Sequence, residues 1–276
     1  MSVNDSILII GHPSSGKTTF IAQFLTRVKK RKSSISLIKA PENIKAVADA
    51  VKKLSNGEAP TATPAGENEE LVLSIQVGEK SIDLVCPDYG GEQVSDMTEL
   101  MTIDDHWKKL LNNSDRWVLF IRAHTIMPRY DLSRNSYEKI DNEKHTSLRS
   151  PGLSEQSKFI ELLQSMLHIK NIGLKHPISM PTISIVLTCW DELETNETPA
   201  QVLQDKLPML LHFVETVWEK DSFEIFGLSA QEFPLNTIEA KDKYLDDLPE
   251  SFGYVVDQNG AKDKDITKLV AATLNL

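Results

Sequence analysis

Cysteine, long apolar runs and positive charge are all scarce in this chain of 276 residues. The two cysteines, Cys86 and Cys189, lie far apart in apolar runs typical of strands, so neither a disulfide framework nor a metal-binding spacing is indicated. No apolar run approaches the roughly 20 residues of a membrane-spanning helix, and no secretory signal precedes the first apolar run. A formal net charge of -10 argues against nonspecific binding to nucleic acid. We therefore expect a soluble cytoplasmic protein without a membrane span or a nucleic-acid partner.

Continuous apolar runs typical of buried strands alternate with amphipathic helical patterns through most of the chain. Strands are predicted in the segments SILIIG, LVLSIQV, KSIDLVC, RWVLFIR, TISIVLT and SFEIFGLSA. Helices are predicted at about 17–31, 42–54, 96–111, 154–169 and 200–220, with a turn at Asn259-Gly260 before a closing helix. The alternation favours an α/β three-layer fold with a mostly parallel central sheet, and the tight turn VGEK predicts one antiparallel edge strand.

The stretch from about 123 to 152 is polar and irregular, with Pro128 and Pro151 near its ends. It contains too few apolar residues to form a core of its own. The chain as a whole is 40% hydrophobic and 25% charged, which is enough for a sizeable buried core. We therefore expect a single domain over residues 1–276, with this stretch as an insertion.

The loop Gly-His-Pro-Ser-Ser-Gly-Lys-Thr after the first predicted strand carries a phosphate-binding motif. Gly11-x-x-x-x-Gly16-Lys17-Thr18 matches the P-loop signature and lies between a buried strand and a helix, as that motif requires. Gly16 lets the backbone close on a phosphate oxygen, and the N–H groups of the loop and helix start converge on the anion. Lys17 is expected to reach the β- and γ-phosphates, and the Thr18 hydroxyl to ligate Mg²⁺. The expected phosphate-binding residues are Gly11, Ser14, Ser15, Gly16, Lys17, Thr18 and Thr19.

Polar residues also follow three other predicted strands. Asp88 can hold Mg²⁺ through its water shell, and Gly91 leaves room for a backbone N–H to meet a γ-phosphate. Asp191 can accept two hydrogen bonds from the N1–H and 2-amino groups of guanine, a pair that adenine does not offer. Ser229 and Ala230 form a short loop whose backbone could donate to guanine O6.

Taken in order, these motifs resemble those of the Ras-like GTPases of the translation-factor-related class. Asp88–Gly91 looks like the Asp-x-x-Gly motif, Thr188–Asp191 like Asn-Lys-x-Asp, and Ser229–Gln231 like Ser-Ala-Lys. The segments GHPSSGKTTF, PTATP and FGYVVDQNGAKDKDITKL add a closer likeness to the bacterial double-GTPase family of conflict and defence systems. This resemblance implies a GTP-binding switch in a defence system, with a second GTPase or an effector encoded nearby as its protein partner.

The resemblance also implies a role for each motif residue. The catalytic candidates are Lys17, Gly91, Glu92 and Gln93. The candidates for the Mg²⁺ site are Thr18, Asp88 and a switch threonine, for which both Thr61 and Thr63 remain open. The residues expected at the guanine base of GTP or GDP are Thr188, Asp191, Ser229 and Ala230.

Several positions depart from the family pattern. Thr188 replaces asparagine, and its hydroxyl can do part of the same loop-tying work. Cys189 replaces the lysine that lies over the base, so Trp190 either covers the base instead or is a core residue. Gln231 replaces the lysine of Ser-Ala-Lys, and we expect weaker guanine affinity. Glu92 stands where a glutamine orients water, and its repulsion from the γ-phosphate predicts slow or partner-assisted hydrolysis.

Two alternatives to a slow GTPase remain open at this point. One is a nucleotide-locked pseudo-GTPase scaffold, which the Glu92 departure favours. The other is an ATP-dependent P-loop phosphotransferase, for which Asp191 would have no role. The tetrad Asp104–Trp107 is interpreted as part of an exposed helix with Trp107 turned inward, rather than as a metal site.

Overall fold

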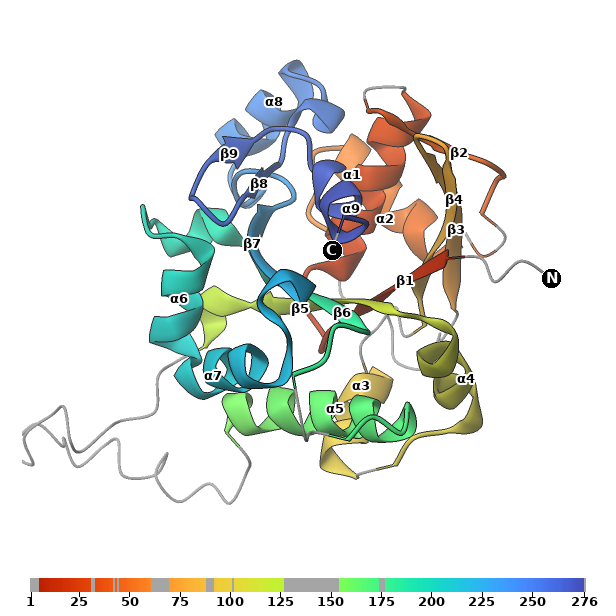
Figure 1. Ribbon diagram of the computed structural model, residues 1–276. Helices are drawn as coiled ribbons and strands as arrows, with labels where there is room; N and C mark the ends of the chain where they lie inside the picture. Colours follow the sequence, from red (N-terminus) through yellow and green to blue (C-terminus); the bar gives the residue numbers. More distant parts are fainter. Residues whose placement is uncertain are drawn as a thin grey trace, which may run out of the picture.

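The computed structural model of the protein describes residues 5–30, 33–41, 43, 45–60, 70–87, 92–100, 102–126, 154–173 and 177–275. Within these residues a nine-stranded sheet runs through the centre, with helices on both of its faces (Figure 1). The strand order is β2-β3-β4-β1-β5-β6-β7-β8-β9. None of the helices in this part of the chain is long and apolar enough to cross a membrane.

The centre of the sheet is parallel. It consists of β4 (Lys80–Cys86), β1 (Asp5–Ile10), β5 (Arg116–Arg122), β6 (Thr182–Thr188) and β7 (Phe223–Ser229). All seven residues of β6 are buried, as expected for a strand that is covered on both faces. The prediction of an α/β three-layer fold with a mostly parallel central sheet is confirmed.

Antiparallel strands extend both edges of the sheet, whereas the sequence analysis predicted a single antiparallel edge strand. At one edge β2 (Ile35–Leu37) and β3 (Leu71–Val77) run antiparallel, and β3 joins β4 through the expected tight turn. At the other edge β8 (Tyr254–Val256) and β9 (Lys262–Asp263) add to β7. The carboxylate of Asp257 accepts the N–H groups of Asn259 and Ala261 and closes the turn between β8 and β9. These two strands are too short to give a sequence pattern of their own.

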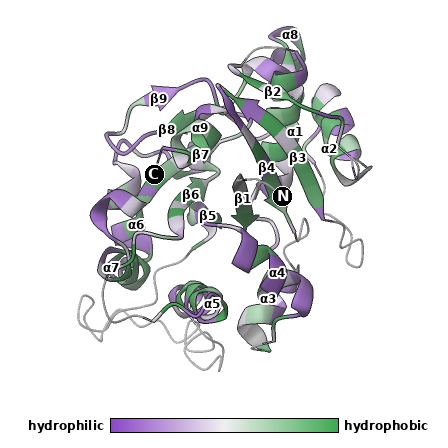
Figure 2. Ribbon diagram, turned by 45° about the vertical axis from the view of Figure 1, so that its right-hand side comes forward, coloured by the Kyte–Doolittle hydropathy of each residue, from purple (hydrophilic) through white to green (hydrophobic). Residues whose placement is uncertain are grey.

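Two apolar clusters separate the sheet from its helical layers. One face carries α1 (Lys17–Lys29), α2 (Lys45–Ser55), α8 (Ile238–Asp246) and α9 (Lys268–Thr273). The other carries α3 (Glu92–Glu99), α4 (Asp105–Asn113), α5 (Glu155–Ile169), α6 (Pro199–Lys206) and α7 (Pro208–Val217). In β1, Ile7 and Ile9 join the first cluster while Leu8 joins the second, because successive side chains of a strand point to opposite faces. Figure 2 shows the apolar strands of the centre between amphipathic helices.

The predicted helix at 96–111 is wrong, because the structure divides this segment into the end of α3 and the start of α4. Asp104 caps α4, and its carboxylate accepts the N–H of Trp107 at 2.8 Å. Asp side chains favour such caps over helix interiors, so the periodic apolar pattern alone suggested a single helix where there are two. Trp107 is buried, as the sequence predicted for this tetrad.

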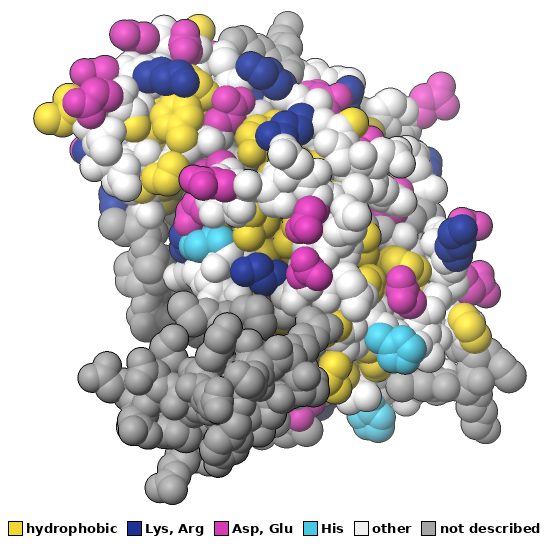
Figure 3. All heavy atoms as spheres, turned by 90° about the vertical axis from the view of Figure 1, so that its left-hand side faces the viewer, with side chains coloured by type: hydrophobic (Ala, Val, Ile, Leu, Met, Phe, Trp, Pro, Cys, Tyr) yellow, Lys and Arg dark blue, Asp and Glu magenta, His cyan; other side chains and the backbone are white. Residues whose placement is uncertain are grey.

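The surface beside α6 and α7 mixes charges of both signs. Figure 3 shows acidic and basic side chains interspersed with apolar and uncharged ones on this face. Charged groups in this arrangement screen one another and produce no strong field of a single sign over the described atoms of the face.

Candidate functional site

The P-loop lies at the carboxyl end of β1, which is flanked by the parallel strands β4 and β5. Gly16 takes φ 88° where the loop enters α1, a left-handed conformation that favours glycine. A Cβ on Gly11 would lie 2.8 Å from the carbonyl oxygen of Phe120 and 2.6 Å from Ser15 Oγ. Both glycines are therefore required by the backbone path, and the sequence signature corresponds to a preformed loop around the start of α1.

Lys17 is folded into this loop. Its side chain is buried, and Nζ donates to the carbonyl oxygens of Gly11 at 2.5 Å and His12 at 3.1 Å. Ser15 Oγ lies 3.4 Å from the same nitrogen. The loop that would surround a phosphate chain thus already holds the ammonium group. The Lys17 side chain would therefore lose little conformational entropy when an anion binds.

The hydroxyl residues of the motif lie around the same loop. Ser15 is buried, Ser14 is exposed with φ 60°, and Thr18 and Thr19 are partly exposed in the first turn of α1. A hydroxyl at the start of a helix, beside converging N–H groups, is well placed for an anion and its counter-ion. Four of the predicted phosphate-loop side chains therefore lie at one end of one helix.

Thr188 ties the end of β6 to the P-loop. Its Oγ1 lies 2.8 Å from the carbonyl oxygen of Ser15 and 3.2 Å from that of Ile121, and the threonine itself is buried. One hydroxyl proton is shared between these two acceptors. The hydroxyl thus connects three neighbouring segments, which is the loop-tying work expected of the residue that replaces asparagine.

A cleft joins the P-loop to the loops after β6 and β7. Its walls are formed by Gly16, Thr19, Thr188, Cys189, Asp191, Glu192, Leu228, Ala230 and Gln231. Asp191 therefore shares one cleft with the first turn of α1, although the two segments are far apart in the sequence. The side-chain oxygen Oε1 of Gln231 is buried and has no hydrogen-bond partner among the described residues.

The loop after β7 is held in place by Ser229. This serine is buried, and its Oγ accepts the N–H of Glu232 at 2.9 Å. Ser229 therefore shapes the turn, while the neighbouring Ala230 lines the cleft directly. Tyr254, on β8 beside this loop, was not identified from the sequence; burial and then the charge of Asp191 raise its pKa to about 12.

Trp190 belongs to the core, which decides between the two interpretations of this residue. Its side chain is 3% exposed, and a Cβ on Gly227 would lie 2.5 Å from its ring. Cys189 instead faces the cleft, from a left-handed backbone with φ 52°. Burial raises the pKa of the Cys189 thiol to about 12, so the thiol is protonated at neutral pH.

Several predicted residues have no described side chain. Thr61, Thr63, Asp88 and Gly91 lie outside the described residues, and Glu92 is described only as the first residue of α3. Their roles stay predictions. Gln93 is described: its Oε1 accepts the indole N–H of Trp107 at 2.6 Å.

His12 is a residue of the P-loop to which the sequence analysis gave no role. Its Nδ1 lies 3.3 Å from Ser95 Oγ on α3, and its ring packs edge-on against Phe159 of α5. Burial lowers the pKa of His12 to about 4; the charge of Glu155 acts in the opposite direction, and those of Lys158 and Lys17 lower it further. His12 is one of the positions of the P-loop signature that any residue can occupy, so the sequence pattern predicted no role for it.

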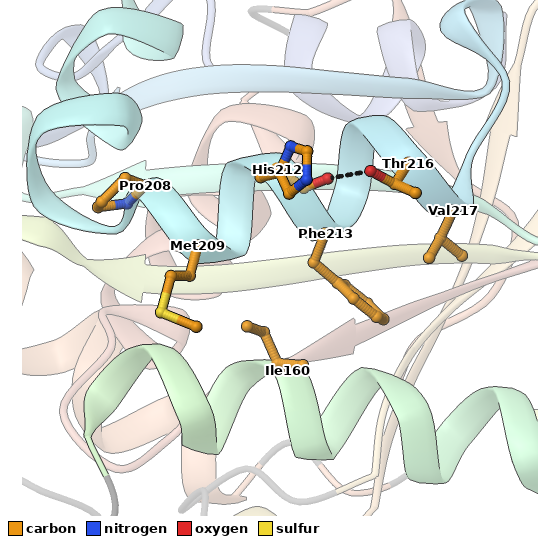
Figure 4. A pocket seen from close by; sticks show the side chains of 7 residues that line it. All are labelled: Ile160, Pro208, Met209, His212, Phe213, Thr216 and Val217. Carbon is orange, nitrogen blue, oxygen red and sulfur yellow. Dashed lines mark hydrogen bonds between the residues drawn. The ribbon is translucent and has the colours of Figure 1, made fainter.

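A separate apolar groove of about 540 Å³ lies between α5 and α7. Figure 4 shows Ile160 of α5 facing the side chains of Met209 and Phe213 on α7, and the hydroxyl of Thr216 donates to the carbonyl of His212 at 2.7 Å. None of the residues that line this groove lines the cleft at the P-loop. The groove is therefore distinct from the candidate site.

Comparison with known proteins matches residues 8–273 of this chain to the family described as Double-GTPase 1. A comparison with curated proteins finds no match. Similar solved structures include the Arl6 BBS3 small GTPase from Trypanosoma brucei with a bound nucleotide analogue, GppNp. That likeness has a TM-score of 0.41 and 11% identity, over 89% of this chain and 97% of the other.

Another similar structure is the Ski7 GTPase-like domain of S. cerevisiae bound to GTP, with a TM-score of 0.46 and 14% identity. That likeness covers 82% of this chain and 43% of the other.

Proposed function

This chain belongs to the Double-GTPase 1 family, and we propose that it binds GTP and GDP with Mg²⁺ and hydrolyses GTP slowly as a molecular switch. The observation that carries the proposal is the single cleft that Asp191 shares with Gly16 and Thr19 of the P-loop. Asp191 is far from Gly16 and Thr19 in the sequence, so the local chain path does not explain why the three residues line one cleft. A nucleotide that spans both ends of the cleft supplies a reason.

At the phosphate end, the loop and Lys17 would bind the β- and γ-phosphates. The close approaches around Gly11 support a cradle of backbone groups that a side chain would fill. The Thr18 hydroxyl fits a hard, oxygen-preferring cation, with Asp88 and either Thr61 or Thr63 as the further candidates. Mg²⁺, when bound, neutralises phosphate charge. Among the described residues, the Thr18 hydroxyl is therefore suited to this ion.

At the base end, Asp191 would accept two hydrogen bonds from guanine. Gln231 lines the same cleft, and its amide nitrogen can donate to guanine O6 together with the backbone of Ala230, because an amide offers both a donor and an acceptor. Adenine would leave the carboxylate unpaired in the cleft, which costs about 1–3 kcal/mol or more. This cost favours GTP over ATP, and with it a GTPase over an ATP-dependent phosphotransferase.

Slow hydrolysis is proposed from the residues beside the expected γ-phosphate. The hydrogen bond from Trp107 occupies the carbonyl oxygen of Gln93, which leaves Glu92 as the better candidate to position water. A carboxylate is repelled by a γ-phosphate, so turnover would be slow or would need a partner. The same observation favours a second function, a nucleotide-locked scaffold that binds GTP without hydrolysing it.

The biological role follows from the family resemblance. We propose that ordering of the Gly91 region by the γ-phosphate presents a surface to a protein partner, either a second GTPase or an effector encoded nearby. The process would be signalling in a bacterial defence system, in the cytoplasm. Co-purification of the chain with the products of neighbouring genes, in the presence of a non-hydrolysable GTP analogue and of GDP, tests this role.

Calorimetric titration of the wild-type protein with GTP, GDP and ATP tests base selection. We expect GTP and GDP to bind about 100-fold more tightly than ATP, because a site built to hydrogen-bond one base rejects the other. Asp191→Asn removes one acceptor and should weaken GTP binding about 10- to 100-fold. The same variant should bind xanthosine triphosphate better than the wild type, since xanthine carries a carbonyl where guanine carries the amino group.

Asp205→Asn, on the exposed face of α6, is the matched control and should leave all three affinities unchanged. Tighter binding of ATP than of GTP would overturn the proposal. Single-turnover hydrolysis then separates the switch from the scaffold. A rate of about 10⁻³ s⁻¹ or less that rises in a lysate of the source cells supports a partner-assisted GTPase, whereas no hydrolysis in either condition supports the scaffold.

A further inference from the structure

Three side chains with different donor atoms meet beside the base end of the cleft. His124 lies in η1 (Ala123–Thr125), directly after β5, and Cys189 and Glu192 lie at η5 (Trp190–Leu193), directly after β6. A ring nitrogen of His124, the sulfur of Cys189 and a carboxylate oxygen of Glu192 all lie within 4.8 Å of one another. Nothing in the proposed binding of GTP uses this combination of atoms.

The backbone holds these residues together. β5 and β6 pair in parallel as far as Arg122 and Thr188, so the two turns leave the sheet side by side. The N–H of Glu192 donates to the carbonyl of Cys189 at 3.0 Å, which closes the turn that carries both residues. Cys189 keeps a left-handed φ of 52°, a conformation that non-glycine residues hold only where the surroundings impose it.

The side chains are already oriented toward one another. His124 Nε2 lies 2.7 Å from Glu192 Oε2, and Arg122 Nη2 lies 3.2 Å from Glu192 Oε1. The two carboxylate oxygens thus have separate partners. An ion that replaced the contact between His124 and Oε2 would leave the contact between Arg122 and Oε1 in place, and such outer contacts hold metal-ligating carboxylates in position.

We propose that His124, Cys189 and Glu192 bind a zinc ion. Imidazole nitrogen, thiolate sulfur and carboxylate oxygen form a mixed donor set that Zn²⁺ accepts and that Mg²⁺ and Ca²⁺ do not favour. Zinc bonds of about 2.0–2.3 Å require ligand atoms to be about 3.4–3.6 Å apart in a tetrahedron. The observed separations therefore need side-chain adjustments of only about 1 Å, and three protein ligands leave a fourth position for water.

Zinc binding releases one proton and moves another. The thiol of Cys189 loses its proton to solvent as the sulfur–zinc bond forms. The neutral ring of His124 keeps one proton, which moves from Nε2 to Nδ1 so that Nε2 can ligate. The contact of 3.5 Å between Arg122 Nε and His124 Nδ1 must then open. No oxidant or reductant is involved.

The test uses the full chain, stripped with a chelator and free of nucleotide, with zinc chloride alone as the probe. Competition against a chromophoric chelator should give one zinc ion per chain with a dissociation constant of about 1 µM or tighter. Cobalt chloride in place of zinc should produce a near-ultraviolet thiolate-to-cobalt charge-transfer band. Cys189→Ser should abolish this band and weaken zinc binding about 100-fold or more, since loss of a group that only positions a metal ligand already costs about 10- to 100-fold.

His124→Gln is a second variant that tests the site without touching the cysteine, and it should weaken zinc binding to a similar extent. His106→Gln is the matched control, because His106 also pairs with a carboxylate, Glu70 at 2.8 Å, but on an exposed surface away from the cluster. It should leave zinc affinity unchanged. Circular dichroism reports whether each variant is folded.

Absence of zinc binding in the wild type would overturn the assignment and leave the three residues as part of the ion-pair network of Arg122 and Glu192. Unchanged binding in a folded Cys189→Ser protein would do the same. Because the probe is added without nucleotide, either result leaves the proposal of GTP binding untouched.

Discussion

The phosphate end and the base end of the candidate cleft are built in different ways. In the proposed site, phosphate binding would depend mainly on the backbone, and the required residue types, Gly11, Gly16 and Lys17, match the motif. Base binding would depend on side chains, and several of them differ from the family pattern. A backbone path admits few residues, whereas a hydrogen bond can be supplied by more than one side chain.

Thr188 illustrates the difference. Its hydroxyl takes over the work of an amide by reaching Ser15 across the sheet, so the tie is preserved although the motif is not. Trp190 illustrates the opposite case, because this side chain lies within the motif and yet packs in the core, away from the site. Sequence identity within a motif is therefore a better guide to the loop than to the base-binding residues.

The largest expected effect comes from Lys17→Ala. Removal of the ammonium group deletes charged hydrogen bonds to the phosphates, each contributing about 1.5–3 kcal/mol, so GTP affinity should fall at least 100-fold. Calorimetry measures the change, and thermal unfolding monitors the loop, since Lys17 also binds the carbonyls of Gly11 and His12. Lys52→Ala, on the exposed face of α2, should change nothing. Retained GTP affinity in Lys17→Ala would show that the phosphate end is not where the P-loop places it.

His12 tests whether the P-loop depends on a side chain as well as on its backbone. Its folded-state pKa of about 4 lies below the ordinary 6.5, so the unfolded chain takes up this proton first. The stabilisation is complete above pH 6.5 and is lost as the pH falls from 6.5 to 4, by up to about 3 kcal/mol. Urea unfolding from pH 4 to 7.5 should therefore show a steeper loss in the wild type than in His12→Gln.

His168→Gln, which changes an exposed histidine of α5, serves as the control for this pH series and should follow the wild-type curve. All other titrating groups are common to the three proteins, including Glu155, Lys158 and Lys17, which act on His12. Parallel curves for the wild type and His12→Gln would mean that His12 is solvated rather than buried against α3 and α5.

Thr188→Val should produce an intermediate effect. The valine keeps the shape but removes the hydroxyl that lies between the carbonyls of Ser15 and Ile121, which costs about 1–3 kcal/mol of unfolding free energy. Since the P-loop loses its tie to β6, GTP affinity should fall about 10-fold as well. Thr188→Ser keeps the hydroxyl and should retain most of the affinity. Equal GTP binding by the valine and serine variants would show that the contact between the Thr188 hydroxyl and the Ser15 carbonyl does not contribute to GTP binding.

The smallest effect on binding is expected for Trp190→Phe. Because Trp190 packs on Gly227 in the core, the variant should lose about 1–2 kcal/mol of unfolding free energy while GTP affinity changes less than about 2-fold. Denaturant unfolding and calorimetry on the same sample measure both. The reverse result, unchanged stability with a tenfold loss of GTP affinity, would indicate that Trp190 contacts the guanine base.

Features with a strong local signal could be predicted from the sequence. The apolar run of β1, the P-loop and the start of α1 follow one another without interruption, and the structure has them in the predicted places. The hairpin of β3 and β4 was equally clear, since two alternating strands flank a tight turn. The division between α3 and α4 was missed, because Asp104 gives a cap signal inside a pattern that could continue as one helix.

What the sequence by itself determined about this protein is the order of its motifs and the residues that must line a phosphate loop, because backbone conformation depends on near neighbours. Only the tertiary structure decided that Asp191 shares a cleft with the first turn of α1, that the Thr188 hydroxyl contacts the carbonyl of Ser15, and that Trp190 is in the core. These outcomes depend on how strands distant in the chain pair and pack. A side chain's partners across a sheet leave no trace in its local sequence.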